Sequence, residues 1–124
     1  MTKAKILIIE DDNDTQKFFN LFLGRKFEIE VFRSNTSCKE VVNNKNFDLL
    51  LLDISLKDGN TGLKLTKKIK SIKEFEKTPV ICLSTHIFNT NEKNTYESYI
   101  DMFLTKPVRN EILLQSINTF IKCS

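Results

Sequence analysis

Acidic residues follow two strongly hydrophobic segments of this 124-residue chain. The acidic run 10–12 comes directly after the apolar segment 6–9, and Asp53 follows four leucines at 49–52. Short apolar runs bounded by polar residues are typical of buried parallel strands, whose carboxyl ends are the usual ligand sites of open α/β sheets. Burying a carboxylate is costly unless a cation or a chemical role accompanies it. We therefore expect chemistry where these two strands end.

Hydroxyl and lysine side chains follow two further apolar segments: Ser84 and Thr85 come after 80–83, and Lys106 comes shortly after 102–104. Carboxylates brought together at neutral pH repel one another, so one of them takes up a proton or a cation joins them. A few oxygen ligands suit Mg²⁺, with Mn²⁺ as a substitute, and an aspartate beside such a metal can attack an activated phosphoryl group. The candidates for this chemistry are Glu10, Asp11, Asp53, Ser84 and Lys106.

Strand and helix patterns alternate along the chain. We expect strands at 4–9, 27–32, 48–53, from Pro79 onward and at 102–104, and helices at 13–23, 35–44, 61–75, 89–99 and 109–121. Five such strand–helix units with right-handed crossovers predict a doubly wound α/β fold, a five-stranded parallel sheet with helices on both faces. The first helix is expected to be capped by Asn13 or Asp14, with Asp12 also a candidate cap, and to end at Gly24. The fourth is expected to be short or mobile, because Asn and Thr are poor helix formers.

Composition points to one soluble globular domain over residues 1–124, with 40% hydrophobic and 28% charged residues. Cys38, Cys82 and Cys123 show no metal-ligand spacing and cannot all pair, so we expect the reducing cytoplasm. We see no signal peptide and no segment long enough to cross a bilayer, and therefore expect no membrane partner. The lysines of the third helix form no stripe with aromatic residues, so direct nucleic-acid binding is not expected.

Four motifs stand in order at the strand ends. They are Ile-Ile-Glu-Asp-Asp at 8–12, Leu-Leu-Asp-Ile-Ser-Leu at 51–56, Pro-Val-Ile-Cys-Leu-Ser-Thr at 79–85 and Phe-Leu-Thr-Lys-Pro at 103–107. Each motif alone is a weak signal, but together and in this order they are strong. The chain resembles a response-regulator receiver domain (CheY-like, of two-component signalling) over essentially its whole length. The resemblance implies the flavodoxin-like strand order 2-1-3-4-5.

The resemblance also implies a role for each matching acid. Asp53 would be the phosphoacceptor, carried as an aspartyl phosphate. Glu10 and Asp11 would form the acidic pair of the Mg²⁺ site, with Asp11 and Asp53 binding the metal directly. The backbone carbonyl of Ser55 would be the third protein ligand.

Other matching residues are implied to act on the phosphoryl group or to report its presence. Ser84 would be the switch hydroxyl, Lys106 the lysine that contacts the phosphate, and Phe103 the switch aromatic. The Lys106–Pro107 bond is expected to be cis, a conformer that costs little before proline. Ser55 and His86 would tune dephosphorylation, although His86 as a solvated loop residue is the alternative.

By this resemblance the domain is a switch, not an enzyme beyond its own phosphorylation and dephosphorylation. A histidine kinase or histidine phosphotransfer protein would donate the phosphoryl group, and the surface of the fourth helix, fifth strand and fifth helix would then change for an unidentified downstream protein or effector domain. The first helix carries more apolar residues than one buried stripe needs, and the exposed ones are expected to dock the donor. These are Phe18, Phe19, Leu21, Phe22 and Leu23.

Three alternatives have different requirements. A haloacid-dehalogenase-type phosphatase needs a second acid two residues after its aspartate, where this chain has Ser55. A flavodoxin-like FMN binder needs a phosphate-holding first loop, which the acidic run 10–12 would repel. A pseudo-receiver would bind partners without phosphorylation; the intact acids and Lys106 argue against it, while Thr85 and the weak fourth helix leave it open.

Overall fold

A computed structural model of the protein describes residues 3–43, 46–54 and 59–121. Within these residues, five parallel strands form one sheet in the order β2-β1-β3-β4-β5, as predicted. The strands are β1 Lys5–Ile9, β2 Glu28–Phe32, β3 Leu49–Ile54, β4 Val80–Ser84 and β5 Met102–Thr105. Every residue of β3 is buried, whereas the edge strand β2 is mostly half-buried. The prediction of a half-buried second strand is therefore confirmed.

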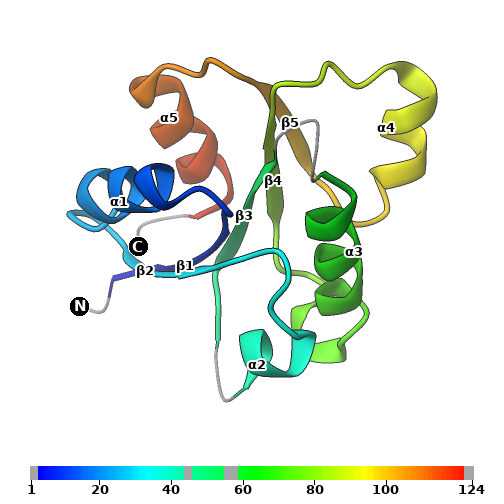
Figure 1. Ribbon diagram of the computed structural model, residues 1–124, viewed down its shortest axis with the longest axis horizontal. Helices are drawn as coiled ribbons and strands as arrows, with labels where there is room; N and C mark the ends of the chain where they lie inside the picture. Colours follow the sequence, from blue (N-terminus) through cyan, green and yellow to red (C-terminus); the bar gives the residue numbers. More distant parts are fainter. Residues whose placement is uncertain (1–2, 44–45, 55–58, 122–124) are drawn as a thin grey trace.

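Helices cover both faces of the sheet, which is the doubly wound architecture. Figure 1 shows α1 and α5 on one face and α2, α3 and α4 on the other. Their bounds are α1 Asn13–Phe22, α2 Cys38–Val42, α3 Gly59–Lys70, α4 Thr90–Tyr96 and α5 Asn110–Phe120, with a short 3₁₀ helix, η1, at Lys73–Phe75.

Alternate residues of the strands pack into two separate hydrophobic layers. Ile6 and Ile8 of β1 belong to the layer under α1 and α5, whereas Leu7 and Ile9 belong to the layer under α2 and α3. Successive side chains of a strand point to opposite faces, so a strand covered on both sides must be apolar at every position. This explains why the sequence shows continuous apolar runs and why the first polar residues appear at the strand ends.

Of the residues expected to cap α1, Asp12 is confirmed, whereas Asn13, Asp14 and Gly24 are not the caps. The helix begins at Asn13 with Asp12 as N-cap, because the Asp12 carboxylate accepts the backbone N–H of Thr15 at 2.9 Å. At the other end Leu23 is the C-cap, and its N–H donates to the Phe19 carbonyl in a right-handed conformation. Gly24 follows the cap without a positive φ, so it does not end the helix in the left-handed way that was expected.

Two other helices differ in length from the sequence prediction. The helix expected at 35–44 forms only over Cys38–Val42, because the Ser37 side chain accepts the Glu40 N–H and caps it late. The helix expected at 61–75 is divided into α3 and η1, with an irregular turn between them. The seven-residue α4 confirms that the fourth helix is short.

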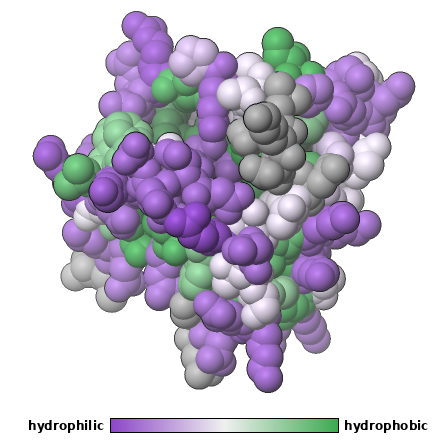
Figure 2. All heavy atoms as spheres, viewed as in Figure 1, coloured by the Kyte–Doolittle hydropathy of each residue, from purple (hydrophilic) through white to green (hydrophobic). Residues whose placement is uncertain are grey.

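No helix in the described part of the chain combines the length and apolar character needed to cross a membrane. On the face shown in Figure 2, most surface atoms belong to hydrophilic residues, and hydrophobic residues appear as small separate patches.

Packing of α3 on the sheet provides a test of the core. Ile69 is 1% exposed, and Ile69→Ala is expected to lower the free energy of unfolding by about 2–5 kcal/mol, because it removes buried contacts and leaves a cavity. Urea unfolding followed by circular dichroism measures this loss. The exposed Lys64 on the same helix provides the control, since Lys64→Ala should change stability by no more than about 0.5 kcal/mol. Equal effects of the two substitutions would contradict this packing.

Candidate functional site

Asp53 is a buried carboxylate at the end of the central strand. It lies one residue before the end of β3 and is 7% exposed. The ammonium group of Lys106 contacts its Oδ1 atom. The backbone N–H of Lys106 donates to the Ser84 carbonyl at 2.8 Å, and the Lys106–Pro107 bond is cis, as expected. The loop after β5 is thus attached to the end of β4, which brings the lysine to the aspartate.

Glu10 lies beside this pair and is also buried, at 6% exposed. Its Oε2 atom accepts the Asp12 N–H at 2.9 Å, and its Oε1 atom is buried without a hydrogen-bond partner among the described residues. Burial is the main cause that raises the pKa of Glu10 to about 8; the neighbouring charge of Asp53 also raises it, whereas the Asp12 N–H and the charge of Lys106 lower it. Near neutral pH Glu10 therefore carries a proton. A bound cation would offset the repulsion between the Glu10 and Asp53 carboxylates in place of that proton.

Asp11 is turned toward the end of β2. Its Oδ1 accepts the Ser34 N–H and its Oδ2 accepts the Ser34 hydroxyl, both at 2.7 Å. Arg33 adds a bond of 2.7 Å to the Asp11 carbonyl and also contacts the side-chain oxygen of Asn13. No group of three acidic, histidine or cysteine residues is gathered closely enough to hold a metal in the described part of the chain. Asp11 is therefore near the other acids but engaged with Ser34.

All three acids nevertheless line one pocket. It measures about 400 Å³ and is lined by Glu10, Asp11, Asp12, Thr15, Ser34, Asp53, Ile54 and Lys106. Carboxylate oxygens of this kind are the donors that a hard divalent cation prefers, and each oxygen can accept more than one bond. The buried Oε1 of Glu10 also lacks a partner. The donor set therefore fits Mg²⁺. Ser55, the remaining expected ligand, lies outside the described residues.

Ser84 is buried at the end of β4, opposite Ile54 of β3 in the strand register. Its hydroxyl oxygen accepts the His86 N–H at 2.9 Å. The ring of Phe103, the expected switch aromatic, is half-buried and lies 4.9 Å from the Phe88 ring between centroids. The His86 ring is bonded to Glu92 of α4 and does not line the pocket around Asp53.

Comparison with known proteins decides the family. A family model described as the response regulator receiver domain matches residues 6–118. The chain belongs to this family. It is a receiver domain of two-component signalling.

Relatives of this receiver domain include both short and very long proteins. The polar-differentiation response regulator DivK of Brucella ovis is 25% identical over 122 residues, and the match covers 98% of each protein. Hybrid signal transduction histidine kinase I of Dictyostelium discoideum is 28% identical over 129 residues. That match covers 98% of this chain but spans only 7% of the kinase.

Solved structures show the same fold. A two-component response regulator from Clostridium difficile is 29% identical with a TM-score of 0.74, and the match covers 95% of each chain. The chemotaxis protein CheY4 of Vibrio cholerae is 19% identical with a TM-score of 0.82, and covers 97% of this chain and 100% of its own. The latter likeness supports the CheY-like fold alone.

Sequence reasoning missed three residues that hold the site of this receiver domain. Ser34 and Arg33 bind Asp11, and Glu92 binds the His86 ring. The position of Ser34 just beyond β2 was a usable signal, because carboxyl ends of parallel strands meet at one edge. For Glu92 the signal was its spacing from Asn89, which matches a capping box.

The raised pKa of Glu10 predicts a pH-dependent stability with metal chelated. Between the ordinary value of 4.5 and the folded value of about 8, the folded state binds a proton that the unfolded chain has released. Stability should therefore fall as pH rises through this range. Urea unfolding at a series of pH values measures the slope, and Glu10→Gln should flatten it whereas the exposed Glu97→Gln should not. An unchanged slope in Glu10→Gln would assign the effect to another group.

Proposed function

We propose that residues 1–124 form a receiver domain that accepts a phosphoryl group on Asp53 from a histidine kinase or histidine phosphotransfer protein. The observation that carries this proposal is the contact between the Lys106 ammonium and a nine-tenths buried Asp53 carboxylate, beside a second buried acid. A buried carboxylate contacted by a lysine at a strand end is held in a fixed orientation. The comparisons support the receiver-domain family, and the contact between Lys106 and buried Asp53 supports phosphoryl acceptance on that aspartate.

The proposed step is a transfer between two side chains. An Asp53 carboxylate oxygen attacks phosphorus, the bond between phosphorus and the donor histidine nitrogen breaks, and that nitrogen keeps the electron pair and takes up a proton. Lys106 then faces the phosphoryl oxygens and offsets their charge. Hydrolysis by water returns Asp53 and releases phosphate. The domain would catalyse no reaction other than these two.

The carboxylates of Glu10, Asp11 and Asp53 are the groups that would hold Mg²⁺, or Mn²⁺ in its place. A bound divalent cation supplies charge compensation for the phosphoryl oxygens. To hold the cation, Glu10 would release its proton, and Asp11 would have to share its carboxylate with Ser34.

The switch we propose begins at Ser84. Its hydroxyl turns from the His86 N–H toward the phosphoryl group, Phe103 changes its packing, and the surface formed by α4, β5 and α5 changes with it. A downstream protein or effector domain would bind this changed surface. The free cysteines Cys38 and Cys82 support a reducing, cytoplasmic setting.

A groove beside Asp53 supports the docking of the phosphoryl donor. It measures about 480 Å³ and runs between α1 and the beginning of α5. Phe18 of α1 lines it and is 43% exposed, and Leu21 on the same helix is 72% exposed. Phe19 and Leu23 are buried, so α1 carries more apolar surface than the core uses. An apolar groove beside the acceptor suits a partner helix that presents a phosphohistidine.

Phosphoryl uptake tests the proposal directly. With Mg²⁺ and acetyl phosphate, intact mass spectrometry is expected to show the gain of one phosphoryl group on the wild type, and no gain on Asp53→Asn or after addition of a chelator. A wild-type protein that binds Mg²⁺ but gains no phosphoryl group would overturn the proposal in favour of a pseudo-receiver.

Docking is tested separately from chemistry. Phe18→Lys is expected to reduce transfer from a phosphorylated histidine phosphotransfer domain about tenfold or more, because central apolar anchors dominate binding. Uptake from acetyl phosphate should be unchanged, since that small donor needs no docking surface. Ile112→Lys on α5, which is 38% exposed and does not line the groove, is the control. Equal transfer to both variants would place the docking surface elsewhere.

A further inference from the structure

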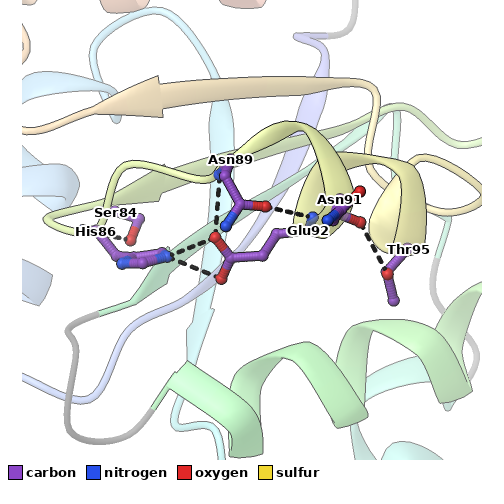
Figure 3. Close-up of polar contacts among 6 residues, drawn as sticks. All are labelled: Ser84, His86, Asn89, Asn91, Glu92 and Thr95. Carbon is purple, nitrogen blue, oxygen red and sulfur yellow. Dashed lines mark hydrogen bonds and ion pairs between the residues drawn. The ribbon is translucent and has the colours of Figure 1, made fainter.

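His86 connects the buried switch serine to the beginning of α4. Its backbone N–H donates to the Ser84 hydroxyl oxygen at 2.9 Å. Its ring Nε2 lies 3.0 Å and 2.9 Å from the Oε1 and Oε2 atoms of Glu92, on the first turn of α4. Figure 3 shows the two side chains pointing toward one another across the loop that joins β4 to α4. Because a carboxylate only accepts hydrogen bonds, the ring nitrogen is the donor.

Glu92 also forms hydrogen bonds with Asn89 at the start of α4. Its Oε1 atom accepts the Asn89 N–H at 3.0 Å, and its own N–H donates to the Asn89 side-chain oxygen at 2.9 Å. These reciprocal bonds are a capping box. Donation by the Asn89 N–H, and then by the His86 ring, holds the pKa of the Glu92 carboxyl below its usual value. One carboxylate therefore fixes the start of the helix and the histidine together.

Helix α4, whose first turn is fixed by the Glu92 carboxylate, makes few other stabilising contacts. It spans seven residues, none of which is buried. Helices this short are marginal by themselves, so caps and neighbouring contacts decide whether they form. Phe88 supplies those contacts, with ring centroids 5.7 Å from Tyr96 of α4, 4.9 Å from Phe103 of β5 and 4.9 Å from His86. A change at His86 thus reaches both α4 and the expected switch aromatic.

We propose that His86 and Glu92 form a latch that holds α4 to the Ser84 loop in the unmodified protein, and that opens when the Ser84 hydroxyl turns to the phosphoryl group. The proposal rests on the proposed function, in which Ser84 makes that turn. The His86 N–H then loses its acceptor, the loop moves, and the ring leaves Glu92. Glu92 is a positioning residue, because it acts on the site through His86 and touches no reacting atom.

The first experiment tests the latch in the unmodified protein. Glu92→Gln keeps a side chain that can complete the capping box but removes the charge that holds the ring. His86→Gln removes the ring itself. Amide hydrogen exchange in α4 is expected to become about threefold to fivefold faster in either variant, since a contact between side chains that are 37% and 34% exposed contributes only modestly to stability. Glu97→Gln, at the end of the same helix, should exchange like the wild type.

A double variant tests whether His86 and Glu92 act on α4 through the same contact. The double variant His86→Gln with Glu92→Gln should exchange no faster than either single variant, because the same contact is lost in each. Additive effects, or no effect of Glu92→Gln, would overturn the latch whatever the protein does with phosphate.

The second experiment tests opening. His86 is the one histidine in the chain, so its ring signals in an NMR spectrum need no assignment. With Mg²⁺ and beryllium fluoride as a phosphoryl mimic, the wild-type signals are expected to move toward those of unmodified Glu92→Gln, and α4 exchange should rise to the variant rate. Intact-mass detection of phosphoryl uptake is measured in parallel. Uptake with unmoved His86 signals would overturn the latch and leave the proposed function standing, whereas absence of uptake would overturn both the function and the opening step.

Discussion

The crowding of negative charge at the ends of β1 and β3 is the constraint on which the rest of the structure depends. Asp53 and Glu10 are both buried there, and Lys106 is the cation that contacts Asp53. Burial, with the neighbouring charge of Asp53 adding to it, raises the pKa of Glu10 to about 8, so Glu10 keeps its proton near neutral pH. The site is stable while Glu10 is protonated, and a bound cation would take the place of that proton. The proposed transient phosphoryl group would be carried at this same edge of the sheet.

The scaffold holds these charged side chains close together because its central strands are buried on both faces. The two hydrophobic layers hold β1, β3 and β4 side by side, and their carboxyl ends meet at one edge. Backbone bonds between neighbouring ends extend this order into the loops, as where Lys106 donates to the Ser84 carbonyl. The positions of the reactive groups are thus set by the sheet register and not by the loops alone.

Stability is distributed unevenly around this edge. The side of α3 is held by fully buried residues such as Ile69, whereas α4 has no buried residue and depends on its capping box and on Phe88. An element with few buried contacts costs little to move, and such elements are the usual moving parts of switches. The arrangement joins a rigid site, through Ser84 and His86, to the least anchored helix of the fold.

The sequence by itself determined the sheet, its order by resemblance, and the residues at the strand ends. Short continuous apolar runs bounded by polar residues are typical of strands covered on both faces, and parallel strands bring their carboxyl ends together. That some apolar residues of α1 are exposed also followed from their excess, and the structure shows that Phe18 and Leu21 are the exposed ones. Only the tertiary structure decided that Asp11 bonds to Ser34, that Glu92 holds the His86 ring, and which of the candidate residues, Asp12, caps α1. Side-chain directions and helix ends depend on partners distant in the chain or on competition among adjacent polar residues, and no local pattern encodes their outcome.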